Sequence, residues 1–190
     1  TMSTGIGGGI VANGQLVRGG NSLSAGEMGH ICLDPDGRKC NCGQRGCYET
    51  FCGGRAVADR MREELAGKPG SRIVQLAGGD MAKIDMRTLE QAVREGDGYA
   101  LKLWDEMAFR NAQAIGMFIN IFNPEKIVLG TLAWAVGKLY TDPIMEYLPR
   151  FSWPQMRRDC EIVCSELRRD IGSYAGIAAA MNHLHEHPER

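Results

Sequence analysis

Four side chains with metal-binding chemistry lie close together in the sequence. They are His30, Cys40, Cys42 and Cys47. Three thiols and one imidazole complete the tetrahedral shell that zinc takes in structural sites, with no position left for a reacting water. Gly43 and Gly46 permit the tight turns that bring neighbouring sulfurs onto one ion. The spacing is not that of a paired CxxC finger, and incidental buried cysteines are the alternative. A structural zinc loop is our prediction.

Two carboxylates flank this loop. Glu27 precedes the histidine in GEMGH, and Glu49 follows the last cysteine in GCYE. Ionised carboxylates accept strong hydrogen bonds from the paired hydroxyls of a sugar. If His30 gives one ring nitrogen to zinc, its other N–H is free to hold a substrate oxygen. The alternatives are that Glu27 is a surface charge and that Glu49 is a carboxylate favoured at a helix N-terminus.

The first residues form a glycine-rich segment, STGIGGGIV. Glycine at 5, 7, 8 and 9 is denser than a plain strand tolerates. Successive glycine N–H groups can cradle phosphate oxygens, and Ser3 and Thr4 add two hydroxyls at that turn. The segment matches neither the Walker pattern nor the dinucleotide fingerprint, so a glycine strand packed on a helix is an equal alternative. Asn13-Gly14 predicts a β-hairpin that follows.

Hydrophobic periodicity predicts the elements that position these residues. The expected helices cover 50–65 (one helix or a pair), 85–96, 99–122, 133–148 and 171–184. A short buried strand is expected at 126–129 and a second β-rich run at 161–167, whereas 69–85 is expected to be mainly a loop. Asp85 is the predicted N-cap of its helix. Alternating helices and strands indicate an α/β fold with partly parallel pairing.

Composition limits the class of protein. The 190 residues fit one domain, and the net charge of −1 argues against general binding to nucleic acid or membrane surfaces. The remaining cysteines (Cys32, Cys52, and Cys160 or Cys164) are predicted core thiols. The odd, clustered set of seven cysteines favours a reducing, cytoplasmic location. We expect no transmembrane helix or signal peptide. Broad apolar stripes permit a homodimer, and His183, His185 and His187 are expected to be solvated.

Several stretches together resemble a known family. They are STGIGGGIVANGQLVRGG, AGEMGH, CNCGQRGCYE, NPEKIVLG and YAGIAAA. Their combination closely resembles the ROK family of bacterial sugar kinases, sugar-responsive repressors and related open reading frames. The resemblance covers the larger, C-terminal lobe, so we expect residues 1–190 to be that lobe and the N-terminal lobe to be absent. It implies an α/β, ribonuclease H-like lobe of the actin and hexokinase type, with a structural zinc loop.

The resemblance also implies roles for individual residues. His30 and the three cysteines match the zinc ligands, and Glu27, His30 and Glu49 match residues that bind sugar hydroxyls. The stretch 3–10 matches the second phosphate-binding segment for ATP, and Gly130 matches a turn near the adenosine. The residues expected to contact nucleotide are therefore Ser3, Thr4, Gly5, Gly7, Gly8 and Gly130. ATP and Mg²⁺ would act in the complete enzyme, together with a hexose or N-acetylated hexosamine.

The implied function is the C-terminal lobe of a glucokinase-like, ATP-dependent hexose kinase. The family's first phosphate loop and its catalytic aspartate belong to the N-terminal lobe, so we expect no catalytic residue here and no activity from this chain alone. Asp34 and Asp36 are expected to be turn residues. Thr131 stands where the family usually has glycine, which could crowd ATP. The alternatives are the sugar-sensing lobe of a ROK repressor and a zinc domain without a ligand; the glycine-rich stretch favours the kinase.

Overall fold

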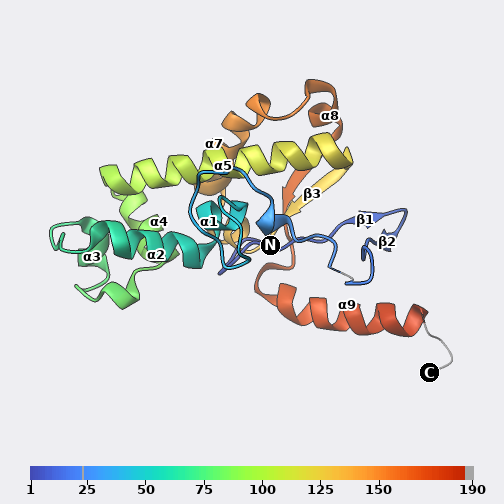
Figure 1. Cartoon of the computed structure of the whole chain (residues 1–190), viewed down its shortest axis with the longest axis horizontal. Coiled ribbons are helices and arrows are strands. Elements are labelled where there is room, and N and C mark those ends of the chain that lie inside the picture. Colours follow the sequence, from blue (N-terminus) through green and yellow to red (C-terminus); the bar gives the residue numbers. More distant parts are fainter. Residues whose placement is uncertain (23, 187–190) are drawn as a thin grey trace.

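The computed structural model describes residues 1–22 and 24–186. One long helix, α5 (Gly98–Phe122), crosses the molecule (Figure 1). The helices before it are α1 (Tyr48–Cys52), α2 (Gly54–Leu65), α3 (Arg72–Leu76) and α4 (Met86–Arg94). Those after it are α6 (Leu132–Val136), α7 (Lys138–Tyr147), α8 (Pro154–Asp159) and α9 (Ile171–Glu186). Helices α1, α4, α7 and α8 pack against α5, whereas α9 lies apart from it. Short 3₁₀ turns are η1 (Met28–His30), η2 (Met81–Lys83), η3 (Leu148–Arg150) and η4 (Arg168–Asp170).

Helix α5 organises the core because it is apolar along most of its length. Asp97 caps its N-terminus by accepting a hydrogen bond from the Ala100 N–H at 2.8 Å, and Asn123 ends it in the left-handed conformation. Helix α7 packs against it: the Trp104 indole N–H donates to the Leu139 carbonyl at 3.0 Å. The prediction of a helix over 99–122 is confirmed, with one extra residue at its start.

The helices before α5 follow the predicted signals. Residues 50–65 form a pair of helices that meet at Gly53. The Asp85 carboxylate accepts from two N–H groups of α4, and the Thr88 hydroxyl accepts from the Asp85 N–H, which completes a capping box. The region 69–85 is not only a loop, because α3 and η2 lie within it. Its apolar Ile73 and Val74 are buried, and burial stabilises a helix too short to persist alone.

Two small sheets lie on one side of the molecule, at the right in Figure 1. Strands β1 (Val11–Ala12) and β2 (Gln15–Leu16) form the predicted antiparallel hairpin, with Asn13 and Gly14 both at positive φ. Strands β3 (Lys126–Leu129) and β4 (Glu161–Cys164) pair in parallel, which confirms the partly parallel sheet. In the described part of the chain, each sheet has two strands.

The structure corrects three further expectations. The helix expected at 133–148 begins at Leu132 and is divided into α6 and α7 by Gly137 at φ 67°, a conformation that interrupts a helix. Strand β3 is not buried as a whole: Val128 is 56% exposed and only Leu129 is buried.

Among the remaining cysteines, Cys52 is buried as expected, whereas Cys32 and Cys164 are exposed and Cys160 is half-buried. Cys164 ends β4, a strand that pairs in the described part of the chain only with β3, and Cys160 lies at the end of α8 just before β4. Of the tail histidines, His187 lies outside the described residues.

Candidate metal centre and adjoining cavities

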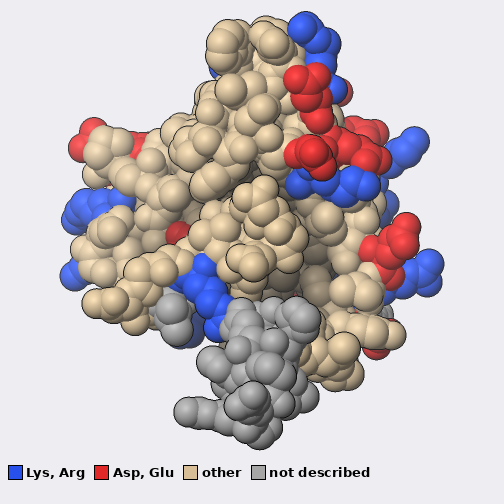
Figure 2. Space-filling model, turned by 90° about the vertical axis from the view of Figure 1, so that its right-hand side faces the viewer, with Lys and Arg blue, Asp and Glu red and all other residues tan. Residues whose placement is uncertain are grey.

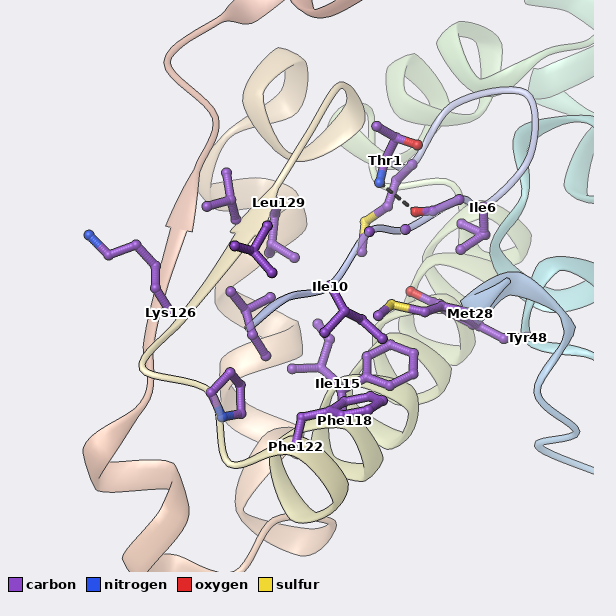
Figure 3. A pocket seen from close by; sticks show the side chains of 18 residues that line it. Thr1, Ile6, Ile10, Met28, Tyr48, Ile115, Phe118, Phe122, Lys126 and Leu129 are labelled. Atoms are coloured by element: carbon purple, nitrogen blue, oxygen red, sulfur yellow. Dashed lines mark hydrogen bonds between the residues drawn. The ribbon is translucent and has the colours of Figure 1, made fainter. Parts of the chain in front are cut away.

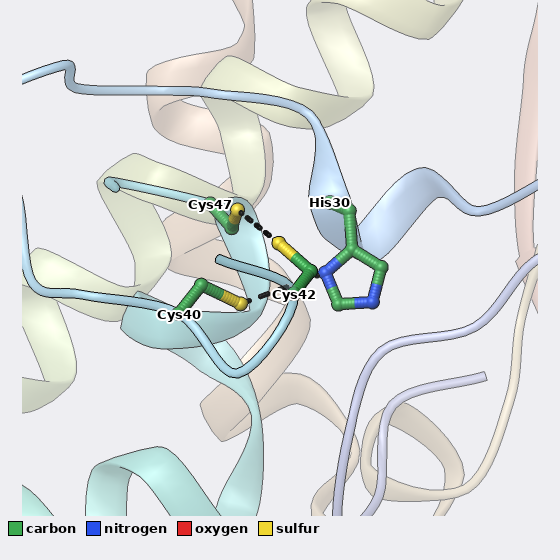
Figure 4. Close-up of side chains that lie close together, drawn as sticks. All are labelled: His30, Cys40, Cys42 and Cys47. Carbon is green, nitrogen blue, oxygen red and sulfur yellow. Dashed lines mark hydrogen bonds between the residues drawn. The ribbon is translucent and has the colours of Figure 1, made fainter. Parts of the chain in front are cut away.

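The four predicted metal-binding side chains converge (Figure 4). One ligand atom from each of His30, Cys40, Cys42 and Cys47 lies within 4.8 Å of all the others. Cys42 Sγ is 3.5 Å from Cys47 Sγ, and Cys40 Sγ is 3.6 Å from His30 Nδ1. A tetrahedral ion with Zn–S bonds of about 2.3 Å separates two sulfurs by about 3.8 Å. The cluster therefore fits a metal ion of zinc's size with only small adjustments.

The loop backbone is folded tightly enough to bring these groups together. Isolated β-bridges join Cys32 to Cys47 and Lys39 to Arg45. Gly46 has φ 64°, and a Cβ there would lie 1.5 Å from the Asp34 carbonyl oxygen, so this position requires glycine. Asp36 N–H donates to the Asp34 carboxylate at 3.2 Å, which confirms the predicted turn. The loop thus has little freedom to place its sulfurs elsewhere.

Arg110 of α5 ties this loop to the helical core. Its guanidinium donates to the Asp34 carboxylate at 3.0 Å and to the Leu33 carbonyl at 3.4 Å, and lies 4.4 Å from the centre of the Phe51 ring. A guanidinium held by a carboxylate and an aromatic face is well suited to a partly buried site. Sequence reasoning missed this contact because its residues are 76 positions apart.

The thiols differ in their tendency to ionise. Burial raises the pKa of Cys47 to about 12, whereas a hydrogen bond with the backbone of Gln44 lowers the pKa of Cys42. A buried thiolate without a cation is costly, and a bound divalent cation compensates this cost because it coordinates the deprotonated sulfur. The donor set therefore suits a metal better than it suits an empty apolar core.

His30 connects the cluster to one of the predicted sugar-binding carboxylates. Its Nδ1 faces Cys40, and its Nε2 lies 4.0 Å from Glu27 Oε2. The side chain of Glu27 is 65% exposed, so it is a surface carboxylate held near the imidazole. Both residues belong to η1 or its N-cap. The two ring nitrogens thus face different partners, one towards the thiols and the other towards Glu27.

Glu49 is less exposed and is tied to the glycine-rich segment. Its Oε2 accepts a hydrogen bond from the Ile6 N–H at 2.8 Å, and a Cβ on Gly5 would lie 2.4 Å from that oxygen. On the other side of this segment, a Cβ on Gly29 would lie 2.4 Å from the Ile6 carbonyl oxygen. The turn with Glu27 and His30 and the helix with Glu49 therefore contact the same short stretch, Gly5–Ile6. Glu49 also lies in the first turn of α1, as expected for a carboxylate at a helix N-terminus, and its role in sugar binding stays a prediction.

Two cavities lie around this stretch, the smaller mainly polar and the wider mainly apolar. One, of about 350 Å³, is lined by Glu49 and Gly5 together with Arg38, Lys39 and Asn41. The other, of about 910 Å³, is lined by Ser3 and by Thr131 and Trp134 of the segment after β3. Thr4 and Arg55 line both cavities, so the two adjoin. Arg55 was not predicted, although it directly follows the Gly53-Gly54 pair after the loop.

The predicted nucleotide-binding residues are divided among three cavities, and Gly130 lines none of the three. Ser3 and Thr4 line the wider cavity, and Gly5 lines the smaller one. Gly7 and Gly8 line neither of these cavities, but an apolar groove of about 370 Å³ beside β3 (Figure 3). Gly130 is buried against Thr1. Two residues further along the chain, the Leu132 N–H donates to the Met2 carbonyl at 3.0 Å. Through this bond the turn after β3 reaches the same cavity as Ser3 and Thr4.

Thr131 is in an unfavourable backbone conformation at the edge of the wider cavity. Its φ is 47° and its ψ is −90°. A β-branched residue at positive φ is an outlier, whereas glycine adopts such angles readily. Thr131, which stands where the sequence comparison with the family predicts glycine, therefore occupies a strained position.

The structure thus combines an α/β fold with a thiol-imidazole loop that lies beside a glycine-rich turn and two adjoining cavities. The family model described as ROK family matches residues 1–183. The chain belongs to the ROK family.

Relatives of this chain include both kinases and regulators. A glucokinase of Thermotoga maritima is 36% identical over 172 residues, which is 90% of this chain and 54% of the relative. The DNA-binding transcriptional dual regulator NagC of Escherichia coli K12 is 30% identical over 179 residues, 93% of this chain and 42% of the regulator. The chain thus spans about half the length of the curated relatives it matches.

The solved structures agree in fold. A ROK family glucokinase from Streptomyces griseus, in complex with glucose and AMPPNP, superimposes with a TM-score of 0.76 and 28% identity, over 90% of this chain and 55% of that one. In the described residues, no helix has both the length and the apolar character to cross a membrane.

Proposed function

We propose that residues 1–190 are the sugar- and nucleotide-contacting lobe of an ATP-dependent ROK sugar kinase with a ribonuclease H-like core. The complete enzyme would transfer the γ-phosphoryl group of ATP to a hydroxyl of a hexose or N-acetylated hexosamine. The adjoining cavities support this proposal, because Thr4 and Arg55 line both of them. Phosphoryl transfer depends mainly on holding donor and acceptor next to each other.

In this proposal the smaller cavity lies on the sugar side, and Glu49 accepts hydrogen bonds from sugar hydroxyls there. Glu27 and His30 do not line this cavity, so they would meet the sugar only where it extends past Ile6. The wider cavity takes ATP with Mg²⁺, with Ser3 and Thr4 near the phosphates and Gly130 at the turn near the adenosine. The catalytic base and the first phosphate loop are expected in a second, N-terminal lobe, so this chain alone is expected to be inactive.

Zinc has a structural role in this proposal. His30, Cys40, Cys42 and Cys47 would hold it and fill its shell, which leaves no position for substrate or water. The ion would fix the backbone that presents the Glu27–His30 turn and Glu49. Sugar binding would therefore depend on the metal only through the shape of the loop.

The metal is tested by Cys42→Ser. We expect this change to abolish stoichiometric zinc and to lower the free energy of unfolding by several kcal/mol, on the order of a lost structural metal site. Zinc content by atomic emission and thermal unfolding measure both. Cys164→Ser is the matched control, because Cys164 is exposed and outside the cluster. Unchanged zinc and unchanged melting in Cys42→Ser would refute a metal at this site.

Sugar binding is tested by Glu49→Gln. The amide oxygen can still accept from the Ile6 N–H, so the fold should be kept while the charge is lost. We expect the Kd for the bound sugar to rise roughly tenfold to hundredfold, with zinc retained. Calorimetry against glucose, mannose, fructose and their N-acetylated amines measures this, with Glu125→Gln as an exposed control. A Kd equal to that of the control would exclude Glu49 as a sugar ligand.

The alternative is the sugar-sensing lobe of a ROK repressor, which the similarity to the NagC regulator favours. The two functions differ in their need for nucleotide. A kinase lobe should bind Mg-ATP in the wider cavity, whereas a sensor should bind sugar alone. Calorimetry with Mg-ATP separates them for this chain, and a coupled ADP-release assay over the same sugar panel does so for a chain that includes a second lobe.

A further inference from the structure

The wider cavity, of about 910 Å³, lies between several helices and the start of the glycine-rich segment. Its lining comes from α2, α4, α6 and the residues around η4 and the start of α9, together with residues 2–4. Most of the lining is apolar, and the charged side chains in it are four arginines, Asp85 and Glu90. A ligand in this cavity would therefore meet hydrophobic surface and several guanidinium groups.

Two of these arginines have no partner. Among the residues that the structure describes, the side chains of Arg87 and Arg168 make no hydrogen bond and no ion pair. Arg62, in contrast, donates to the carbonyls of Met81 and Ile84 at 3.1 and 2.7 Å. At the right edge of the face in Figure 2, Lys and Arg side chains likewise lie among Asp and Glu. Arg87 and Arg168 are therefore available to a ligand.

The carboxylates of the cavity do not neutralise this charge. Asp85 accepts hydrogen bonds from two N–H groups of α4, and Glu90 is paired with Arg94 at 2.7 Å. Unpaired cations in a concave, mainly apolar site strengthen the local positive potential. The cavity therefore favours an anionic ligand.

The backbone is strained at two places around the same cavity. The described residues other than glycine with positive φ are Asn13, Asn123, Thr131 and Arg168. Asparagine tolerates this conformation, whereas Thr131 at 47° and Arg168 at 52° are unfavourable. Both of these residues line the wider cavity. Strained residues of this kind concentrate at ligand-binding sites, so they indicate that the cavity has a binding function.

Arg87 lies towards the end of the cavity formed by the glycine-rich segment. It follows Met86 at the start of α4. A Cβ on Gly54 would lie 2.8 Å from the Ser3 carbonyl oxygen and 3.2 Å from Met86 Cγ, so the start of α4 and the Ser3 backbone meet at this glycine. This is the end that the proposed function gives to the phosphates of the donor.

Arg168 lies towards the other end, beside the turn after β3. A Cβ on Gly130 would lie 3.3 Å from Ile171 Cδ1, so the start of α9 contacts this turn. Arg168 is one 3₁₀ turn before Ile171, and Trp134 of α6 lines the cavity from the segment that follows Gly130. An indole and a guanidinium, both planar, are therefore present where the proposed function has the nucleoside.

This end of the cavity has few hydrogen-bond acceptors. The carbonyls of Gly130 and Thr131 already accept from the N–H groups of Ala133 and Ala135, at 3.3 and 2.9 Å. The cavity residues of the segments 131–136 and 168–171 include no Asp, Glu, Asn or Gln. Adenine presents an amino group where guanine presents a carbonyl oxygen, so a site that selects adenine needs an acceptor for that amino group.

We propose that the wider cavity binds purine nucleoside triphosphates without distinguishing adenine from guanine. Arg87 would bind the phosphates as a guanidinium fork, and Trp134 and Arg168 would stack on the faces of the base. Stacking depends on the area of the ring and not on its edge, so both purines would be accepted. This inference rests on the proposed function, because it concerns the phosphoryl donor of the same site.

The test is calorimetry with MgATP, MgGTP and magnesium tripolyphosphate. We expect the chain to bind the two nucleotides with Kd values within about threefold of each other. Arg168→Gln and Trp134→Leu should each raise both of these Kd values roughly tenfold and leave the Kd for tripolyphosphate unchanged, because tripolyphosphate has no base to stack. Arg87→Gln should raise the Kd values for all three probes roughly tenfold.

Arg158→Gln is the matched control. Arg158 is exposed and lines none of the three cavities, so the control removes the same charge at a remote place. Thermal unfolding of every variant shows whether it is folded. A change that appears in Arg168→Gln but not in Arg158→Gln is then due to the position of the guanidinium and not to net charge.

Two results would overturn the proposal. One is MgATP bound roughly tenfold or more tightly than MgGTP, which would mean that the edge of adenine is recognised. The other is nucleotide affinity in Arg168→Gln and Trp134→Leu equal to that of the control. Either result leaves the proposed kinase function standing, because MgATP still binds. If the chain bound none of the three probes, this proposal and the donor site of the proposed function would both be wrong.

Discussion

The helices around α5 and the strands beside them bury their side chains to different degrees. In the helices, Leu89, Met107 and Ile119 are at most 1% exposed. Near the strands, Val11 is 69% exposed and Val128 is 56% exposed. A helix satisfies its backbone hydrogen bonds internally, whereas a strand needs a neighbour on each edge. The helical side can therefore form a closed core from this sequence, and the strand side has open edges.

Truncation of a core side chain should separate the two sides most strongly. Leu89→Ala should lower the free energy of unfolding by about 2–5 kcal/mol, because it leaves a cavity among well-packed helices. Val128→Ala should change it by less than about 0.5 kcal/mol, because the side chain is mostly in solvent. Urea unfolding followed by circular dichroism measures both. Equal losses would mean that the strand side is as well packed as the helices.

A smaller change can weaken the helical side at the contact between α1 and α5. Tyr48 directly follows Cys47 in the chain, and its hydroxyl donates to the amide oxygen of Asn111 in α5. The Asn111 amide N–H donates in turn to the Met107 carbonyl at 2.7 Å. Tyr48→Phe leaves a buried amide oxygen without a partner, which should cost about 1–3 kcal/mol. Tyr174→Phe, at a 54% exposed position in α9, is the control in the same unfolding assay. Similar small effects of both would show that this bond is not important for stability.

The smallest expected effect is a gain on the strand side. Thr131→Gly should raise the free energy of unfolding by about 1 kcal/mol, because glycine tolerates φ 47°. For a chain of this size, that corresponds to an increase in Tm of roughly 2–4 °C. Thr131→Ala should give less, since alanine keeps a Cβ at positive φ. If alanine stabilised as much as glycine, crowding of the threonine side chain and not backbone strain would be the cause.

Local features of the fold were predictable from the sequence. The Asp85 cap, the Asn13-Gly14 turn and the bounds of β3 depend on a few neighbouring residues, and the structure has all of them. The clustering of the four thiol and imidazole groups was also predictable, because the ligands lie within one loop. In each of these cases the interacting residues are close together in the sequence, so the connection along the chain already limits their possible geometry.

Contacts between distant positions were not predictable. Glu49 binds the Ile6 N–H from 43 positions away, and Arg110 reaches Asp34 from 76 positions away. The glycine-rich segment is read as one unit in the sequence, but its residues line three different cavities, because each faces a different neighbour. The exposure of β3 likewise depends on which strands lie beside it, and the four residues of β3 do not determine this by themselves.

The bond between Glu49 and Ile6 has a thermodynamic consequence. One oxygen of this carboxylate holds the backbone at the start of the glycine-rich segment, and the other is available to a ligand. In the proposed function, sugar binding in the smaller cavity would therefore be coupled to the position of residues 5–10. Such coupling is reciprocal. A second molecule that orders residues 5–10 would change the affinity for sugar at Glu49, and the sugar would change the affinity for that second molecule by the same factor.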